Sequence, residues 1–210
     1  MSDSNVRSVP GQRGAVLSLD FYRREVREVA RDLLGMHLVT LLRGKRTAGL
    51  IVETEAYLPQ GDSACHGSKK RTPRTEVMFA AGGVAYVYPI HARVCFNVVT
   101  GETDQPAAVL IRAIEPTEGI EWMQRRRQRE KLTELARGPG RLCQALGIDR
   151  AINGWDLSRG ERIWIESHSP VTAKEIIITP RIGVTSATDL LLRYAIGQNC
   201  YVSRPRLADC

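Results

Sequence analysis

Apolar residues recur along the first half of the chain in two periods, and each period predicts a type of element. Five of them are spaced by three and four, as one buried face of a helix requires: Val26, Val29, Ala30, Leu33 and Leu34. The helical stretch opens at residues 19–22, and Gly35 ends it. Apolar runs that are typical of strands follow at residues 37–42, 48–57, 84–88, 94–100 and 107–114.

Shorter elements are predicted in the rest of the chain. The polar turn at residues 43–46 contains a glycine, so the strands on either side of it are expected to form a hairpin. Glu115-Pro116 is expected to open a helical region, and Gly147 to close a short helix over residues 142–146. Four further strands are predicted around residues 162–166, 175–179, 183–184 and 191–194. Because strands and helices do not alternate regularly, the pattern predicts an α+β fold.

Length and composition indicate one folded domain. The chain has 210 residues, of which 43% are hydrophobic and 25% charged, as in globular proteins and unlike disordered ones. Residues 1–14 are polar and are predicted to form a flexible arm, and residues 15–210 to form a single domain. No apolar run approaches the length of a membrane helix, and the N-terminus does not resemble a signal peptide. We therefore expect a cytoplasmic protein (nucleoid-associated in a bacterium) with no membrane partner.

The net charge of +7 favours a polyanionic partner such as nucleic acid or an anionic membrane surface. The chain has five cysteines, an odd number, and no CxxC pair. This usage is typical of reduced thiols, and it offers no zinc-type ligand cluster. The four histidines show no ligand spacing either, so no metal is expected.

The strand over residues 48–57 contains the most informative side chains. Because side chains alternate across a strand, Glu53, Glu55 and Tyr57 are expected on one face. Val52 and Ala56 are expected on the other face, which we assign to the core. A carboxylate in a partly dry pocket has a raised pKa and can act as a base. The alternative is a solvated strand face whose glutamates pair with lysine or arginine.

Several other residues suit a nucleic-acid site, and each also has an ordinary structural explanation. His66 lies in the long polar segment at residues 58–75, where a surface histidine is common. Tyr88 shares one side of its strand with Tyr86, and core packing explains both equally well. Asn97 follows an apolar run and could simply satisfy backbone groups. Arg112 stands in an apolar strand and needs a partner, either phosphate or a carboxylate such as Glu53.

The basic side chains with the best position for phosphate contact lie in two segments. The polar segment carries four of them, and a fifth follows a glycine-rich turn. They are Lys69, Lys70, Arg71, Arg74 and Arg141.

Read together, five stretches resemble the alkyladenine DNA glycosylase family, also called the 3-methyladenine DNA glycosylases of the mammalian type. The resemblance runs from about residue 17 to residue 205, and the combination of motifs is highly specific. The stretches are IVETEAYLPQGDSACHGSKKRTPR, MFAAGGVAYVYPIHARVCFNVVT, AAVLIRAIEP, GPGRLCQALGI and PRIGV. It implies one compact α+β domain around a curved, mainly antiparallel sheet flanked by helices. It also implies a monomer without a cofactor that acts on double-stranded DNA.

The resemblance implies a monofunctional enzyme that flips damaged purines out of the duplex and hydrolyses their N-glycosidic bond with water. The implied substrates are 3-methyladenine, 7-methylguanine, hypoxanthine and ethenoadenine. Glu55 matches the residue that activates the water, and Arg112 and the backbone carbonyl of Ile182 match its partners. In the base pocket, Tyr57 and His66 match one wall and Tyr88 the opposite wall.

Two further positions are taken from the same resemblance. Asn97 matches the pocket residue that crowds the exocyclic amino group of normal guanine. The family usually continues from Tyr-Val-Tyr with Ile-Tyr-Gly-Met and uses that tyrosine to fill the gap in the duplex. Here the segment appears one residue shorter. Counting forward puts His91 at that position and counting back from Asn97 puts Ile90 there, and we expect His91 to be the wedge.

Two other function classes compete with the glycosylase. A binding module for nucleic acid without catalysis explains the basic charge, but it does not explain an acidic strand that faces phosphate. A hydrolase of free nucleosides needs neither the basic segment nor a wedge. Excision of a base from duplex DNA separates both alternatives from the glycosylase.

Overall fold

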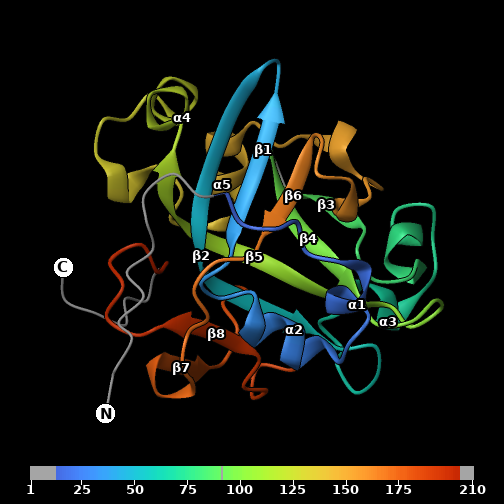
Figure 1. Ribbon diagram of the computed structural model, residues 1–210. Helices are drawn as coiled ribbons and strands as arrows, with labels where there is room; N and C mark the ends of the chain where they lie inside the picture. Colours follow the sequence, from blue (N-terminus) through green and yellow to red (C-terminus); the bar gives the residue numbers. More distant parts are fainter. Residues whose placement is uncertain (1–12, 91, 204–210) are drawn as a thin grey trace, which may run out of the picture.

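The computed structural model describes residues 13–90 and 92–203, and the predicted wedge His91 lies outside the described residues. Within those ranges, eight strands pair antiparallel into one sheet in the order β3-β4-β5-β2-β1-β6, and β8 joins β2 to β7 (Figure 1). The strands are β1 (His37–Leu42), β2 (Lys45–Tyr57), β3 (Ala85–Ile90), β4 (Arg93–Thr100), β5 (Ala107–Glu118), β6 (Ile163–Glu166), β7 (Ile176–Thr179) and β8 (Arg193–Ile196). The predicted α+β fold with an antiparallel sheet is confirmed.

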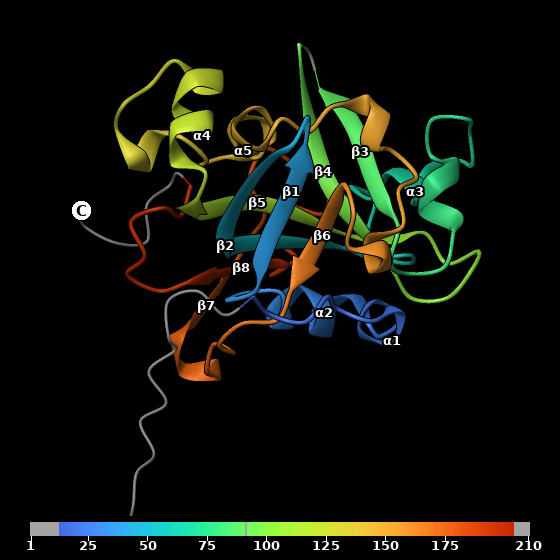
Figure 2. The same cartoon turned by 45° about the horizontal axis from the view of Figure 1, so that its top comes forward.

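Helices flank the sheet at two ends. In Figure 2, α1 and α2 lie at the bottom, whereas the tip of the β3–β4 hairpin projects at the top and α4 and α5 lie beside that upper end. The helices are α1 (Leu19–Tyr22), α2 (Val26–Asp32), α3 (His66–Lys69), α4 (Ile120–Arg127) and α5 (Pro139–Leu146). Single 3₁₀ turns are η1 (Glu76–Phe79), η2 (Leu132–Glu134), η3 (Arg150–Ile152), η4 (Leu157–Arg159) and η5 (Ala173–Glu175). None of the described helices is long and apolar enough to cross a membrane.

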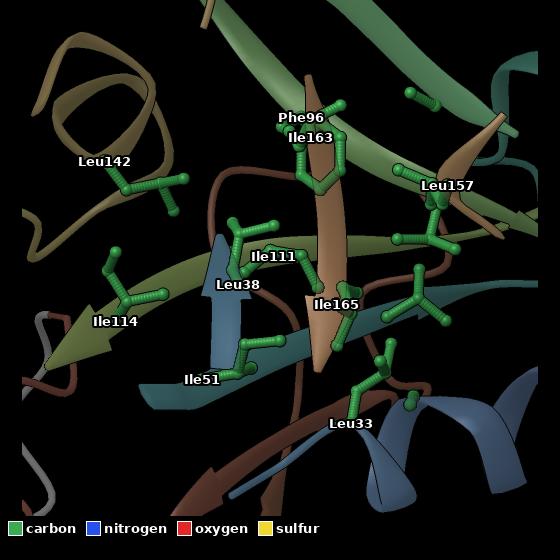
Figure 3. Close-up of a cluster of buried hydrophobic side chains, with 14 of the residues drawn as sticks. Leu33, Leu38, Ile51, Phe96, Ile111, Ile114, Leu142, Leu157, Ile163 and Ile165 are labelled. Atoms are coloured by element: carbon green, nitrogen blue, oxygen red, sulfur yellow. The ribbon is translucent and has the colours of Figure 1, made fainter. Parts of the chain in front are cut away.

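One apolar core joins the sheet to α2 and α5 (Figure 3). Its side chains come from four of the described helices and from every strand except β7, and they are almost completely buried. Examples are Leu33, Leu38, Ile51, Phe96, Ile111, Ile114, Leu142, Leu157, Ile163 and Ile165. The expected hairpin is present, because β1 and β2 pair through a two-residue turn at Arg43 and Gly44. Both turn residues have positive φ, as a type I′ turn requires.

Three predicted elements differ from the structure. The first helical stretch is two helices, because the Glu25 side chain accepts hydrogen bonds from the backbone N–H groups of Arg27 and Glu28 and starts a new helix. Residues 115–118 extend β5 along β2, so α4 begins only after Gly119. Residues 183–184 form no strand.

The prediction that residues 51–56 have one buried and one accessible face is also wrong. Both faces of this part of β2 are fully buried, from Ile51 to Ala56. The reason is that segments outside the strands fold over its glutamate face, where the Ser203 N–H and hydroxyl donate to Glu53 and the Ile182 N–H donates to Glu55. A second expectation fails at Cys200, which is disulfide-bonded and not a reduced thiol.

A close approach of two backbones at Gly119 gives a test of this topology. Gly119 has φ +68°, and a Cβ atom there would lie 2.4 Å from the carbonyl oxygen of Arg46. Gly44 has a similar φ of +70° but open space around it. We expect Gly119→Ala to lower the free energy of unfolding in urea by at least about 1 kcal/mol more than Gly44→Ala, because only the former adds a clash to the backbone strain. Equal losses would contradict the β2–β5 packing described here.

Candidate active site

Four charged side chains are buried together where β2, β5 and β8 meet. Glu53 and Glu55 stand at alternate positions of β2 and are both 0% exposed. Arg112 on β5 bridges them, with its Nε atom 3.2 Å from Glu53 Oε1 and its Nη1 atom 3.1 Å from Glu55 Oε1. Arg193 on β8 places its Nε atom 2.6 Å from Glu53 Oε1. We call Glu53, Glu55, Arg112 and Arg193 the charge cluster, and its formal charges cancel.

Glu53 is fully occupied by partners from within the protein. Besides the two arginines, it accepts hydrogen bonds from the backbone N–H of Ser203 at 2.8 Å and from its hydroxyl at 2.9 Å. Arg112 and Arg193 also donate to Ser203, at 3.5 and 3.4 Å. The end of the described chain is therefore bound to the same carboxylate that positions Arg112. Both oxygens of Glu53 are therefore occupied by groups of the protein itself.

Glu55 has three donors around it, each from a different direction. The backbone N–H of Ile182 donates to Oε1 at 2.8 Å, the Tyr57 hydroxyl donates to Oε2 at 3.0 Å, and Arg112 adds its charge. Burial raises the pKa of Glu55, and these three donors and charges offset only part of that effect. In the structure, Ile182 therefore contacts Glu55 through its backbone N–H. The resemblance implied a different contact, between the backbone carbonyl of Ile182 and the attacking water.

A cavity of about 490 Å³ lies directly against this group of residues. That volume is in the range of sites for small organic ligands. All three partners of Glu55 line the cavity, so the carboxylate stands immediately behind the wall. The lining includes the predicted pocket residues Tyr57, His66, Tyr88, Asn97, Arg112 and Ile182. The structure therefore brings together residues that are up to 125 positions apart in the sequence.

The aromatic side chains of the cavity are arranged differently from the predicted walls. The His66 ring lies 3.9 Å from the Tyr88 ring, centroid to centroid, at an angle of 31°. The Nδ1 atom of His66 is 3.2 Å from the hydroxyl oxygen of Tyr86. His66 therefore shares a wall with Tyr88, whereas the prediction grouped it with Tyr57. A planar ligand would lie between Tyr57 and this His66–Tyr88 pair.

A guanidinium group covers the outer face of each of the two pocket tyrosines. Arg181 lies 4.6 Å from the centroid of the Tyr57 ring and forms a buried two-pronged ion pair with Asp62, at 2.6 and 2.7 Å. Arg74 lies 4.1 Å from the centroid of the Tyr88 ring and donates to the carbonyl of Pro89 at 2.8 Å. Neither arginine lines the cavity, so both support the tyrosines from behind.

Two further predicted residues take defined positions. The Asn97 side chain donates to the Tyr86 carbonyl at 3.0 Å, and this bond fixes its orientation at the cavity wall. Ile90 is the last residue of β3 and is 44% exposed, although its side chain also lines the cavity. It pairs with Arg93 as the last pair of the β3–β4 hairpin. A large apolar side chain in that position suits insertion into a base stack.

The predicted phosphate contacts have different surroundings. Arg71 forms ion pairs with Glu76 and Asp104, so its charge is neutralised within the protein. Arg74 is exposed and packs on Tyr88 as described above. Lys70 and Arg141 are exposed. Lys69 belongs to α3.

Sequence reasoning missed Arg193, Ser203 and the Arg181–Asp62 pair. The signal for Arg193 was present, because it interrupts the apolar run Leu191-Leu192-Arg193-Tyr194 in the way that Arg112 interrupts its own strand. Ser203 offered no signal, since its contact depends on a fold-back across 150 residues. Within the described residues, no group of three or more histidine, cysteine, aspartate or glutamate side chains is arranged to hold a metal ion.

Comparison with known proteins agrees with the site. The chain matches the family model of methylpurine-DNA glycosylases over residues 20–200. It is 44% identical to a Carboxydothermus hydrogenoformans protein over 190 residues, which cover 90% of this chain and 99% of that one. It is 49% identical to a Methanocella arvoryzae protein over 180 residues, which cover 85% and 89%. The names of both relatives give the activity as 3-methyladenine DNA glycosylase and mark it as unproven.

The chain therefore belongs to the methylpurine-DNA glycosylase family. The resemblance found in the sequence is confirmed, and so is the enzyme class, a hydrolase of N-glycosyl bonds in DNA.

The charge cluster makes Glu53 a test of the site's architecture. We expect Glu53→Gln to lower the free energy of unfolding by about 3–5 kcal/mol, because it leaves buried arginine charge without a counter-ion. The exposed Glu161 offers a matched control, since the same substitution there should change stability by less than about 0.5 kcal/mol. Urea unfolding of both variants measures the difference. A loss below about 1 kcal/mol for Glu53→Gln would show that the cluster does not hold these strands together.

Proposed function

We propose that the protein is a monofunctional DNA glycosylase of base excision repair. Its substrates are alkylated or deaminated purines in duplex DNA, namely 3-methyladenine, 7-methylguanine, hypoxanthine and ethenoadenine. The observation that carries this proposal is the position of Glu55, a buried carboxylate of raised pKa immediately behind the wall of an aromatic cavity. We propose a monomer as the active form.

The cavity suits a purine that has left the base stack. A base inside a duplex is out of reach, and flipping it out costs a few kcal/mol, less when the base is damaged. Stacking on aromatic side chains returns about 1–3 kcal/mol per base. Tyr57 on one side and the His66–Tyr88 pair on the other supply these faces. A wedge fills the gap, for which His91 stays the expected residue and Ile90, 44% exposed, is the alternative.

The chemistry needs a base and a stabilising negative charge at the same place. As the bond to the sugar breaks, positive charge develops on the sugar ring, and a nearby carboxylate stabilises it. A water at the cavity wall that takes the place of one of the donors to Glu55 can pass its proton to the carboxylate. Arg112 keeps Glu55 oriented through this exchange, because its own position is fixed by Glu53. Asn97 stands at the wall, where it can crowd the amino group of normal guanine.

The competing function is a nucleic-acid-binding module without catalysis. It shares the basic surface and the aromatic cavity with the glycosylase. A binding module has no need for a second buried carboxylate, Glu55, that three donors hold beside the cavity. Burial of a charge is costly unless it is paired, so the arrangement favours a catalytic role.

We expect Glu55→Gln to bind damaged DNA with the affinity of the wild type and to excise the base at least about 100-fold more slowly. The amide retains an acceptor for the Ile182 N–H, so the fold should persist, but it cannot take a proton from water. The measurement uses a duplex with a single hypoxanthine, followed by alkaline cleavage of abasic sites, and a separate binding titration. Excision by the variant at the wild-type rate would exclude Glu55 as the base. Absence of excision by the wild type on this and on methylated DNA would favour the binding module.

A further inference from the structure

The segment that follows β7 forms one wall of the base cavity and is anchored at a single buried residue. Five consecutive residues of this segment, 182–186, line the cavity. Their backbone belongs to neither a helix nor a strand. The structure describes all of residues 180–191, and only Arg181 is buried among them. The position of this wall therefore depends on the groups that Arg181 contacts.

Arg181 contacts the end of β2 and the turn that follows it. Its Nη1 atom donates to the carbonyl oxygen of Ala56 at 3.0 Å, and this carbonyl belongs to the peptide unit that joins Ala56 to Tyr57. Nη1 and Nη2 donate to the two carboxylate oxygens of Asp62, at 2.6 and 2.7 Å. The guanidinium carbon lies 4.6 Å from the centroid of the Tyr57 ring. Arg181 thus holds Tyr57 by its backbone and by its ring at the same time.

Asp62 is itself held rigidly within the turn after β2. It accepts hydrogen bonds from the backbone N–H groups of Leu58 and Ala64, both at 3.0 Å. Burial alone raises the pKa of Asp62, but the hydrogen bonds from Arg181 and Leu58 outweigh burial, and the pKa is lowered. The side chains of Asp62 and Arg181 are both fully buried. The pair is therefore ionised at neutral pH, and it joins the turn after β2 to the segment after β7.

The two groups next to Arg181 are also two of the three groups that surround Glu55. Ile182 follows Arg181 in the chain, and its backbone N–H donates to Glu55 Oε1 at 2.8 Å. The Tyr57 hydroxyl donates to Glu55 Oε2 at 3.0 Å. Burial, and then the charge of Glu55, raise the pKa of Tyr57, so its hydroxyl stays protonated and remains a donor. One buried arginine therefore contacts both segments that supply these hydrogen bonds.

We propose that the Arg181–Asp62 pair positions the catalytic carboxylate, by holding the Tyr57 hydroxyl and the Ile182 N–H against Glu55. This inference rests on the proposed function, and it gives Arg181 a task beyond the support of an aromatic ring. Neither member of the pair lines the cavity, so both act through Tyr57 and Ile182 and not on the base itself. Arginine suits this task because its planar group donates in several fixed directions at once.

The proposal has a consequence for the protonation of Glu55. Hydrogen bonds that a carboxylate accepts favour its ionised form and lower its pKa. Without the pair, the two donors are no longer held in place, so the pKa of Glu55 should rise further. A protonated Glu55 cannot take a proton from water, and excision should then be lost at a higher pH than in the wild type.

The test measures the protonation of Glu55 directly, by NMR titration of the carboxyl carbons in protein with isotope-labelled glutamate. The signal that is missing from Glu55→Gln identifies this residue. Arg181→Met/Asp62→Asn removes both charges together, so that no buried charge loses its counter-ion and the net charge stays the same. The matched control is Arg74→Met, which removes the guanidinium from the ring of the other pocket tyrosine, Tyr88.

We expect the titration midpoint of Glu55 to rise by at least about one pH unit in the double variant, since a lost hydrogen bond to a charged group shifts a pKa by about this much. Arg74→Met should keep the wild-type midpoint. An unchanged midpoint in the double variant, or an equal rise in both variants, would overturn the proposal. If the double variant unfolds, Arg181→Lys replaces it with the same expected rise, because one ammonium group cannot reach Asp62, the Ala56 carbonyl and the ring together.

The titration requires neither DNA nor turnover, so its outcome is separate from that of the glycosylase proposal. A wild type that fails to excise hypoxanthine and methylated bases refutes the activity but leaves the titration midpoints interpretable. In an active enzyme, the acidic limb of the excision rate should move with the midpoint in the double variant. A limb that stays at the wild-type pH while the midpoint rises would exclude Glu55 as the base.

Discussion

The interaction on which the site depends is the burial of two carboxylates and two guanidinium groups between three strands. Placing a lone charge in such an interior is costly, and removal of Glu53, which both arginines share, leaves buried arginine charge without its counter-ion. Arg193 forms an ion pair with Glu53, whereas Arg112 forms ion pairs with both glutamates. The charge of Arg112 therefore offsets only part of the effect of burial on the pKa of Glu55. The raised pKa of Glu55 follows from this arrangement, because burial outweighs its remaining donors.

The cavity obtains its rigidity from groups that do not touch the ligand. Arg181 is fixed by Asp62 and supports Tyr57, while Arg74 covers Tyr88 and binds the backbone at Pro89. Preformed aromatic walls lower the entropic cost of holding a flipped base. Arginine thus has two tasks around this site. It balances buried carboxylates and it supports aromatic rings.

Much of the fold and part of the site could be predicted from local sequence, and the limits have physical causes. Period-two alternation placed Glu53, Glu55 and Tyr57 on one face of β2, but it could not show that the segments around Ile182 and Ser203 cover this face. The helix predicted from Glu115 begins only at Ile120, because pairing of residues 115–118 with β2 overrides local preference. His66 was assigned to the wrong neighbour, since the fold of the polar segment decides which ring it meets. Arg71 was predicted to contact phosphate, but local sequence could not show that Glu76 and Asp104 form ion pairs with it.

The most direct test of the account is the pH dependence of excision from a duplex with 7-methylguanine, whose charged base needs no protonation to leave. We propose that Glu55 acts as the ionised base, and its pKa is raised, so the single-turnover rate constant should be maximal above that pKa. It should fall tenfold per pH unit below it. The account predicts that this acidic limb lies above the ordinary glutamate value of about 4.3. A rate constant that stays level down to about pH 4.3 would contradict a buried glutamate as the base.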